Sequence, residues 1–186
     1  PLTWVFRVKR SPDGEIRKFK ARLCLRGDLQ HWVTEETFAP TVHWSTVRTF
    51  LVLAITLGWV TVSIDWANAF VQTPLEKPQI ARLPRGWRSP VGPESCLKLH
   101  KSLYGSKLSP RLWWLHLRRA LLDMNMKECP HDQCLLYRDN LLMVLYVDDA
   151  GLASPDRKYI DAFVQELRDR GFDLDIENDF SEYLGL

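Results

Sequence analysis

Strands show in this sequence as alternating apolar and polar residues, and helices as apolar residues spaced three or four apart. Residues 4–9 and 15–26 flank the turn sequence Ser11-Pro12-Asp13-Gly14, which predicts a β-hairpin. A period of two on its second strand separates an apolar face from a basic face. The apolar face holds Phe19, Ala21, Leu23 and Leu25, and the basic face holds Lys18, Lys20, Arg22 and Arg26. The basic face is either a solvated surface or a row that meets phosphates.

The middle of the chain predicts one helix and one strand before a proline-rich connection. Ser45 is the expected N-cap of a helix that runs to about Leu57, and Gly58 is its expected stop. Residues 59–65 then alternate as a strand, which leaves Asp65 at its end on the polar face. Residues 74–93 contain several prolines, and we interpret them as connecting sequence.

The C-terminal half predicts two helices and four more strands. Ser109-Pro110 is a helix start, with an apolar stripe at Trp113, Leu117, Ala120, Leu121 and Met124. Residues 134–138 and 141–147 predict a hairpin, and 150–153 a returning strand, so that Asp148-Asp149 lie at a tight reversal. Ser154-Pro155 caps a last helix that carries Ile160, Phe163, Val164 and Leu167 and ends at Gly171, before a strand at 172–176. This order favours an α+β architecture, an antiparallel sheet covered on one face by helices.

Composition narrows the class of protein without identifying it. The 186 residues are 46% hydrophobic and 26% charged, as in folded globular proteins, and the net charge of +2 does not indicate a polyanionic partner. The longest apolar stretch, residues 49–60, is too short for a membrane span, and no secretion signal opens the chain. We therefore expect an intracellular protein, not secreted, with reduced cysteines and no membrane contact. Because it starts at Pro1, we expect a piece of something longer.

Two groups of residues could bind a metal. Cys129, His131 and Cys134 have ligand side chains, but their spacing fits no common zinc pattern, so we interpret them as ordinary structural residues. Asp148-Asp149 follow a long apolar strand, and adjacent carboxylates repel unless a hard cation offsets their charge; the alternative is a solvated turn. Asp65 also closes an apolar strand. If neighbouring strand ends bring these acids together, they could hold the Mg²⁺ ions that phosphoryl transfer requires.

Seven segments occur in one order along almost the whole chain. They are FKARLCLRGDLQ (19–30), TFAPTV (37–42), VSIDWANAFVQTPL (62–75), LPRGW (83–87), CLKLHKSLYGSKLSPRLWW (96–114), LYVDDAGL (145–152) and YLGL (183–186). Together they resemble the reverse transcriptase domain of Ty1/copia-type retrotransposon polyproteins. The resemblance implies a right-hand polymerase with an N-terminal fingers hairpin, fingers at about 1–60 and 75–115, palm at about 61–74 and 116–186, and no thumb. It also implies RNA-directed DNA polymerase activity, a nucleotidyl transfer.

The resemblance implies a role for each matching position. Asp65, Asp148 and Asp149 are the catalytic ligands of two Mg²⁺ ions, with Mn²⁺ as a substitute. The implied dNTP-binding residues are Lys20, Arg22, Trp66, Ala67, Asn68, Ala69, Phe70, Tyr104 and Gly105. Phe70 would lie under the sugar and exclude a 2′-hydroxyl, unless it is only a core aromatic. The implied template or primer contacts are Ser109, Pro110, Arg111 and Tyr146, with Ser109 alternatively only a helix cap.

Partners follow from the same resemblance: an RNA or DNA template with its primer, dNTPs, and the rest of the polyprotein, including integrase and ribonuclease H. The implied location is a cytoplasmic particle or the nucleus. Some positions depart from the family pattern, namely Trp66-Ala67, Ser106-Lys107-Leu108 and the acidic residues after Gly171. One alternative is therefore a catalytically incompetent retroelement fragment with weak nucleic-acid binding. Another is a metal-dependent nuclease, which would not need Phe70 or Tyr104-Gly105.

Overall fold

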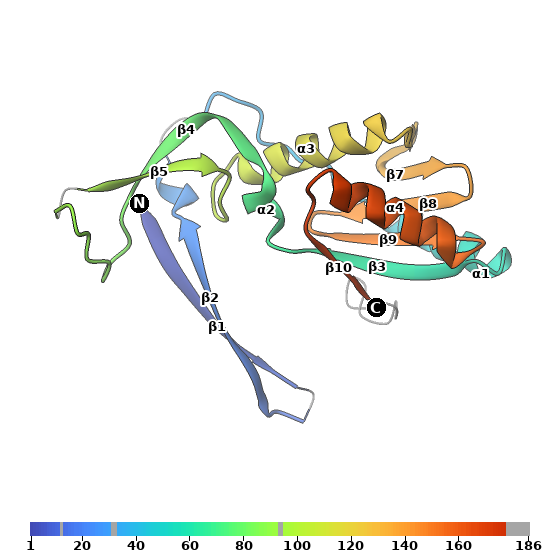
Figure 1. Ribbon diagram of the computed structural model, residues 1–186, viewed down its shortest axis with the longest axis horizontal. Helices are drawn as coiled ribbons and strands as arrows, with labels where there is room; N and C mark the ends of the chain where they lie inside the picture. The colour runs from blue at the N-terminus through green and yellow to red at the C-terminus, as the bar shows by residue number, and fades with distance from the viewer. Residues whose placement is uncertain (12, 31–32, 93–94, 178–186) are drawn as a thin grey trace. The chain divides into compact units, whose positions relative to one another are not determined.

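The chain divides into two compact units. The computed structural model describes residues 1–11, 13–30, 33–92 and 95–177. Pro1–Thr37 and Phe70–Leu112 form one unit, here called the hairpin unit, and Phe38–Ala69 and Trp113–Leu186 form the other, the sheet unit. Figure 1 shows the elements of both. Pro12 and the motif at residues 183–186 lie outside the described residues.

The hairpin unit begins with the predicted hairpin, which is confirmed. Strands β1 (Leu2–Arg10) and β2 (Ile16–Leu25) pair antiparallel, from Leu2 opposite Leu25 to Arg10 opposite Ile16. The amide of Gly14 donates to the carbonyl of Ser11 across the turn. A short 3₁₀ helix, η1 (Gly27–Leu29), follows β2.

A second strand pair replaces the predicted connection. Strand β4 (Pro74–Arg82) pairs antiparallel with β5 (Cys96–Lys101), so the prediction of connecting sequence is wrong for residues 74–82. Proline cannot donate to a strand ladder, which is why proline-rich sequence argues against a strand. Here Pro74 is the first residue of β4 and Pro78 lies in the irregular part of the ladder, before regular pairing resumes at Gln79 opposite Leu99.

The sheet unit is built on six antiparallel strands. Their order is β10-β3-β9-β8-β7-β6, with bounds β3 (Val60–Trp66), β6 (Lys127–Cys129), β7 (Asp132–Arg138), β8 (Leu141–Tyr146), β9 (Asp149–Ser154) and β10 (Leu174–Glu177). The predicted second hairpin is β7–β8, and the predicted returning strand is β9. These predictions are confirmed, with β9 beginning one residue earlier, at Asp149.

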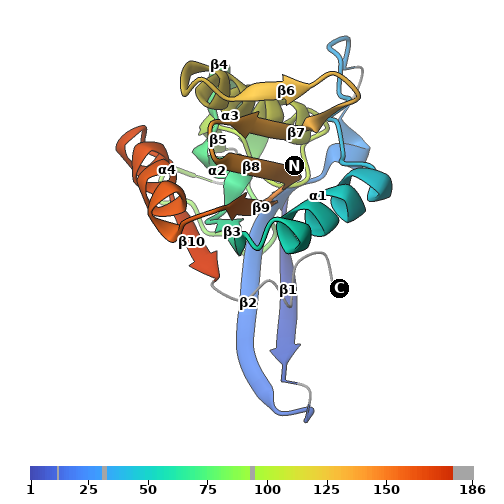
Figure 2. The same ribbon diagram turned by 90° about the vertical axis from the view of Figure 1, so that its right-hand side faces the viewer.

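Helices cover both faces of this sheet. Within the described residues the α-helices are α1 (Trp44–Thr56), α2 (Ala69–Gln72), α3 (Ser109–Asp123) and α4 (Arg157–Asp169). Figure 2 views the strands nearly end on and shows α4 and α1 on opposite sides of the sheet. Every residue from Ala150 to Ser154 in β9 is buried, as expected for a strand covered on both faces. The prediction of helices on one face only is therefore wrong.

The predicted apolar stripes form the core of the sheet unit. Ile160, Phe163, Val164 and Leu167 of α4 are buried, and so are Trp113, Leu117, Leu121 and Met124 in and after α3. Among the described residues, no helix is both long and apolar enough to cross a membrane.

Two helix starts differ from the prediction. The N-cap of α1 is His43, not Ser45, and a residue from another element completes the cap: Asp132, at the start of β7, accepts from the His43 amide and the Thr46 hydroxyl. The N-cap of α4 is Asp156, not Ser154, and its side chain accepts from the Lys158 amide. Ser154 instead donates its hydroxyl to the carbonyl of Asn140.

Candidate active site

Strand β3 places Asp65 at the surface beside a buried aromatic cluster. Val62, Ile64 and Trp66 are buried, whereas Asp65, between Ile64 and Trp66, is exposed on the opposite face. The Trp66 ring meets the rings of Trp113 and Phe172 at centroid distances of 5.5 and 5.7 Å. This packing buries the face of β3 that lies opposite Asp65.

The reversal between β8 and β9 carries the acidic pair. Tyr146 pairs with Asp149 across the reversal, and Val147 and Asp148 form the turn. Val147 has a φ of +51°, a left-handed conformation that is a real outlier for a β-branched residue. Its carbonyl accepts a hydrogen bond of 2.8 Å from the indole N–H of Trp113. The turn is tight enough to leave Asp148 and Asp149 at the strand end, as the pattern predicts.

Strand register brings the distant acid to this pair. Asp65 lies directly opposite Asp149 in the β3–β9 ladder, and the Trp66 amide donates to the Asp148 carbonyl at 3.3 Å. Residues directly opposite in antiparallel strands have Cβ atoms about 4.5–5.5 Å apart. An acid from the first half of the chain and the acidic pair from the second half thus meet at one end of the sheet.

The electrostatics of this sheet end are those of crowded negative charge. Burial raises the pKa of Asp149 to about 6, and the nearby charges of Asp148, Asp65 and Glu177 act in the same direction. On the other side of β3, Asp175 lies opposite Asp65, so acids from three strands form one row. Like charges directly opposite one another destabilise a sheet, and a bound cation removes that repulsion.

These acids have the donor chemistry that a hard divalent cation requires. Mg²⁺ binds carboxylate oxygens and keeps several waters, so two or three carboxylates suffice. Across the parts of the chain that the structure describes, no three or more His, Cys, Asp or Glu side chains are gathered closely enough to count as a metal cluster. The argument that these acids could bind a divalent cation therefore depends on two observations: Asp65 lies opposite Asp149 in the ladder, and the pKa of Asp149 is raised.

In the hairpin unit, three of the predicted nucleotide-binding side chains are neighbours. The guanidinium of Arg22 lies 5.4 Å from the centre of the Tyr104 ring, and the rings of Tyr104 and Phe70 are 4.8 Å apart. Arg22 and Lys20 are both half-buried on the basic face of β2. A cation, a phenol and an aromatic ring are thus held together within this unit.

Gly105 has a structural reason to be glycine. Its φ is +82°, and a Cβ at this position would overlap the carbonyl oxygen of Leu25. A Cβ at Gly27 would in turn overlap the carbonyl of Gly105, and the Leu25 amide donates to the Tyr104 carbonyl at 2.7 Å. The close approach that glycine permits here is to the chain's own backbone.

Two of the four backbone amides that we predict to bind the triphosphate, in residues 66–69, form hydrogen bonds within the sheet unit. The amides of Trp66 and Ala67 donate to the carbonyls of Asp148 and Asp173. Asn68 follows with a φ of +53°, a conformation that asparagine tolerates better than most residues, and Ala69 begins α2. A role in phosphate binding stays a prediction, and it concerns the Asn68 and Ala69 amides most directly.

The predicted template residues differ in accessibility. The Ser109 hydroxyl is buried, accepts from the hydroxyl of Ser102 and donates to the carbonyl of Leu103. Arg111 forms an ion pair with Glu36 at 2.8 Å, and Pro110 is half-buried. Tyr146, at the end of β8, is exposed. Their contacts with template or primer stay predictions, and the Ser109 hydroxyl is used within the protein.

Comparison with known proteins identifies the family. A family model described as reverse transcriptase (RNA-dependent DNA polymerase) matches residues 1–186. The chain belongs to this family. It is similar to the Retrovirus-related Pol polyprotein from transposon RE2 of Arabidopsis thaliana, with 29% identity over 98% of the chain and 13% of the relative. For the Pol polyprotein from transposon TNT 1-94 of Nicotiana tabacum, the identity is 28% over 98% of the chain and 14% of the relative.

A yeast relative extends the same result. The Truncated transposon Ty1-A Gag-Pol polyprotein of Saccharomyces cerevisiae is 30% identical over 82% of the chain and 12% of its own length. The resemblance to copia-type polyproteins that the motifs predict is thereby confirmed: this is a reverse transcriptase domain of that type. The chain spans about one-eighth of the length of these relatives.

Sequence reasoning missed three residues around the site of this reverse transcriptase domain. Trp113 is predicted as a core residue, but its indole also bonds the turn before Asp148. Asp132 caps α1 from another element, and Asp175 joins the acidic row. Only Asp175 had a signal, because the acids after Gly171 depart from the family pattern. The other two depend on contacts between segments far apart in sequence.

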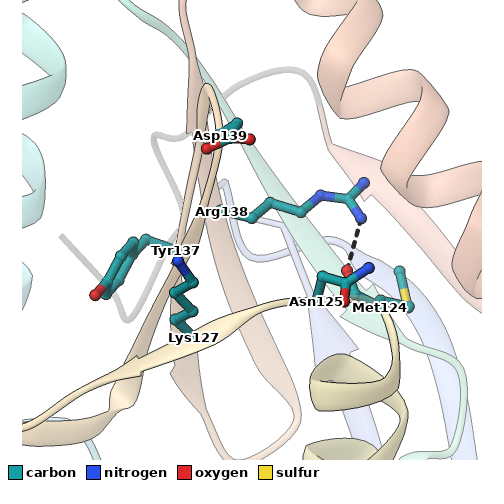
Figure 3. A pocket seen from close by; sticks show the side chains of 6 residues that line it. All are labelled: Met124, Asn125, Lys127, Tyr137, Arg138 and Asp139. Atoms are coloured by element: carbon teal, nitrogen blue, oxygen red, sulfur yellow. Dashed lines mark hydrogen bonds between the residues drawn. The ribbon is translucent and has the colours of Figure 1, made fainter.

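A cavity of about 500 Å³ lies at the other end of the β7–β8 hairpin of this reverse transcriptase domain (Figure 3). Met124, Asn125, Lys127, Tyr137, Arg138 and Asp139 line it. Arg138 spans it and donates to the Met124 carbonyl and to Glu166. Because β8 runs from Leu141 to Tyr146, this cavity and the acidic pair flank opposite ends of one strand. The arginine is used to join α4 to the segment after α3.

Proposed function

We propose that this chain is the fingers-and-palm part of an RNA-directed DNA polymerase that adds dNTPs to a primer 3′-hydroxyl. The observation that carries the proposal is the register of Asp65 opposite Asp149, with Asp148 beside it at the same strand end. The proposed fingers and palm boundaries stay as predicted from the resemblance. The division into compact units gives residues 38–60 to the sheet unit.

Asp65, Asp148 and Asp149 would hold two Mg²⁺ ions, for which Mn²⁺ can substitute. When bound, the ions would supply Lewis-acid activation of the primer hydroxyl and neutralise charge on the leaving pyrophosphate. The raised pKa of Asp149 supports this assignment, because a carboxylate that resists ionisation beside other acids is one that a cation stabilises. The chain's own contribution is to fix the three carboxylates on two neighbouring strand ends.

The proposal gives a role to every predicted nucleotide-binding residue except Trp66 and Ala67, whose amides bond within the sheet unit. Lys20 or Arg22 attracts the triphosphate, since a cation near the phosphate oxygens offsets charge that develops there. The amides of Asn68 and Ala69 bind the same tail. Phe70, with its ring against Tyr104, lies under the sugar, and Gly105 keeps the Tyr104 loop against β2. Most of the rate acceleration then comes from positioning and charge neutralisation.

The proposed partners are those of a polyprotein. They are an RNA or DNA template with primer, contacted by Pro110, Arg111 and Tyr146, and the integrase and ribonuclease H segments of the parent chain. The proposed location is a cytoplasmic particle or the nucleus.

Primer extension tests this function. The chain, alone and within its longer polyprotein, is given a homopolymer template, a primer, the matching dNTP and Mg²⁺. We expect extension that Asp148→Asn lowers by at least about a thousandfold, because a metal ligand is lost. Asp139→Asn is the matched control, since Asp139 lies in the turn at the opposite end of β8 and is exposed.

The outcomes separate the candidate functions. Extension that depends on Asp148 but not on Asp139 supports the polymerase. No extension in either context, with the protein folded, supports the incompetent fragment. Cleavage of nucleic acid without dNTP supports the nuclease.

Sugar selection tests Phe70 separately. Phe70→Val removes the ring that packs on Tyr104, and we expect ribonucleotides to be incorporated in place of deoxynucleotides. Phe38→Val is the control, because Phe38 is an exposed aromatic of the sheet unit. Unchanged sugar discrimination in Phe70→Val removes Phe70 from this role and leaves the metal-binding acids untouched.

A further inference from the structure

The turn that carries the catalytic pair is held in an unfavourable backbone conformation. Val147 has a φ of +51°, where the crowding of a β-branched side chain against its own backbone is severe. Residues in such conformations persist only when the surrounding structure holds them there. Some contact must therefore keep the peptide between Val147 and Asp148 in place.

One side chain makes that contact. The indole N–H of Trp113 donates to the carbonyl of Val147 at 2.8 Å, and Trp113 is 1% exposed. Its ring is fixed on several sides: Trp66 lies 5.5 Å away edge-on, and Phe172 and His116 lie 6.1 and 6.4 Å away. The donor is thus rigid, and it bonds the one carbonyl that separates the left-handed residue from Asp148.

The neighbouring tryptophan shows that aromatic packing alone does not demand such a bond. Trp66 belongs to the same cluster and is buried, yet its indole nitrogen has no hydrogen-bond partner among the described residues. An indole in this cluster can therefore serve for packing only. In Trp113 the N–H is additionally directed to the Val147 carbonyl.

We infer that Trp113 is a positioning residue of the active site, which holds the strained Val147 turn and thereby aims Asp148 and Asp149 at the end of β3. The inference rests on the proposed function for its catalytic consequence, but not for the existence of the clamp. Loss of the N–H leaves a carbonyl without its donor and lets φ of Val147 relax toward negative values. The two carboxylates then shift relative to Asp65.

Trp113→Phe is the direct test, because it keeps an aromatic ring and removes only the donor and part of the ring area. Within the polyprotein, we expect extension to slow by about tenfold or more, since small displacements of catalytic groups have effects of that size. The KM for dNTP should change less than about threefold, and the Mg²⁺ concentration for half-maximal rate should rise. A KM effect without a change in rate or metal dependence would overturn the inference.

Val147→Gly provides the rescue. Glycine adopts positive φ at little cost, so a turn with glycine at this position needs the clamp less. We expect Trp113→Phe to slow extension by less than about threefold when it is made in the Val147→Gly background. Equal losses in both backgrounds would show that Trp113 acts through packing and not through the strained turn.

Phe172→Leu is the control for packing. Phe172 packs on the rings of Trp66 and Trp113, and its ring has no donor for the Val147 carbonyl. We expect it to lower the unfolding midpoint about as much as Trp113→Phe does, while the extension rate and the Mg²⁺ dependence stay within about twofold of the wild type. A loss of extension equal to that of Trp113→Phe would overturn the inference.

A measurement without catalysis separates failure of the clamp from failure of the proposed function. In the wild-type chain, we expect the Trp113 indole proton to exchange slowly with solvent. In NMR spectra, we expect Trp113→Phe to shift the backbone amide signals of Asp148 and Asp149 more than Phe172→Leu does. Those shifts in a chain that extends no primer would support the clamp and reject the polymerase. Extension without those shifts would support the polymerase and overturn the clamp.

Discussion

The two units of this reverse transcriptase domain differ in where their apolar residues lie. Among the described residues, the sheet unit contains almost all of the buried hydrophobic side chains, and the hairpin unit contributes only Leu2 and Ala81. The hairpin unit instead exposes large apolar residues, including Phe6 at 75% and Phe19 at 74%. The sheet unit therefore obtains its stability from a hydrophobic core, whereas the hairpin unit exposes its large apolar side chains.

The β1–β2 hairpin exposes an aromatic face and a basic face. On one face, Trp4 stacks on Phe6 and on Trp87, and on the other face cations lie opposite cations, as in the pairs Arg7–Lys20 and Lys9–Lys18. Like charges directly opposite destabilise a hairpin, and a two-stranded hairpin is marginal in water. Burial therefore accounts for the apolar residues of the sheet unit, whereas neither burial nor charge pairing accounts for the residues of the hairpin.

Core truncation should give the largest contrast between the units. Phe163 of α4 is fully buried, so Phe163→Ala should lower the free energy of unfolding by about 3–5 kcal/mol. Phe19→Ala removes the same atoms from an exposed position and should change it by less than about 0.5 kcal/mol. Urea unfolding of both variants measures the difference. Equal losses would mean that the apolar face of the hairpin is covered in solution and that the contrast between the units is wrong.

Removal of the remote cap should have the next largest effect. Burial raises the pKa of Asp132, but hydrogen bonds from Thr46, His43 and Cys134 outweigh it and hold the pKa below its ordinary value. Asp132→Ala leaves these donors without an acceptor, which should cost about 2–3 kcal/mol near neutral pH. Hydrogen exchange in the first turn of α1 should rise with it.

The pH dependence of stability tests whether the Asp132 carboxylate is responsible for this effect. Because the folded-state pKa is lowered, the contribution of Asp132 is present at neutral pH and is lost as the pH falls through that pKa. The difference between wild type and Asp132→Ala should therefore shrink in acid. Asp132→Asn, which keeps one acceptor oxygen, should lie between them. A difference that does not depend on pH would point to lost packing instead.

The contrast between the units also explains which parts of the fold the sequence could predict. The stripes on α3 and α4 and the β7–β8 hairpin follow from periodicity, because a core selects apolar side chains at regular spacing. Strands β4 and β5 have no such core: Ile80 is exposed and prolines interrupt the pattern, so local sequence indicated a connection. The α1 cap could not be predicted because Asp132 is 86 residues from Thr46.

For the candidate site, the sequence located the acids at strand ends but could not give their register. A shift of one residue would have put Asp65 on the other face from Asp149, and only packing of the whole sheet excludes it. The resemblance supplied the identities of Phe70, Tyr104 and Arg22, whose contact with one another the structure adds. The bond from Trp113 to Val147 had no signal in the sequence, because a buried tryptophan is usually interpreted as core.

Within the sheet unit, the acidic row differs from the buried core, because its negative charges oppose folding. Burial, with the charges of Asp148, Asp65 and Glu177, raises the pKa of Asp149 to about 6 from 3.8. A raised folded-state pKa means that this group favours folding most below about pH 4 and loses that contribution as the pH rises through about 6. Without metal, Asp149→Asn should therefore stabilise the protein at pH 8 by roughly 1–2 kcal/mol, after allowance for partial solvent exposure.

Thermal unfolding from pH 4 to pH 8 measures this effect. Wild type and Asp149→Asn should have similar midpoints near pH 4 and separate as the pH rises. Mg²⁺ should then raise the midpoint of the wild type more than that of the variant. Asp175→Asn is the matched control, because Asp175 faces Asp65 from the other side but is exposed, and it should change the midpoint little. A variant less stable than wild type at pH 8 would reject the crowded-charge description.

The smallest effect should reveal most about the hairpin. Lys18→Glu converts the Lys9–Lys18 pair into an opposite-charge pair, which should stabilise the hairpin by about 0.2–1 kcal/mol, measured as slower amide exchange in β1 and β2. The same change should weaken binding to single-stranded nucleic acid and lower the slope of log affinity against log salt by about 1, because one phosphate contact is lost. Lys127→Glu, in β6 of the sheet unit, controls for net charge and should leave the slope unchanged. If Lys18→Glu makes the hairpin more stable and weakens its binding to nucleic acid, the charges of the basic face favour binding to a polyanion at the expense of hairpin stability. If the affinity is unchanged, the basic face is only a solvated surface.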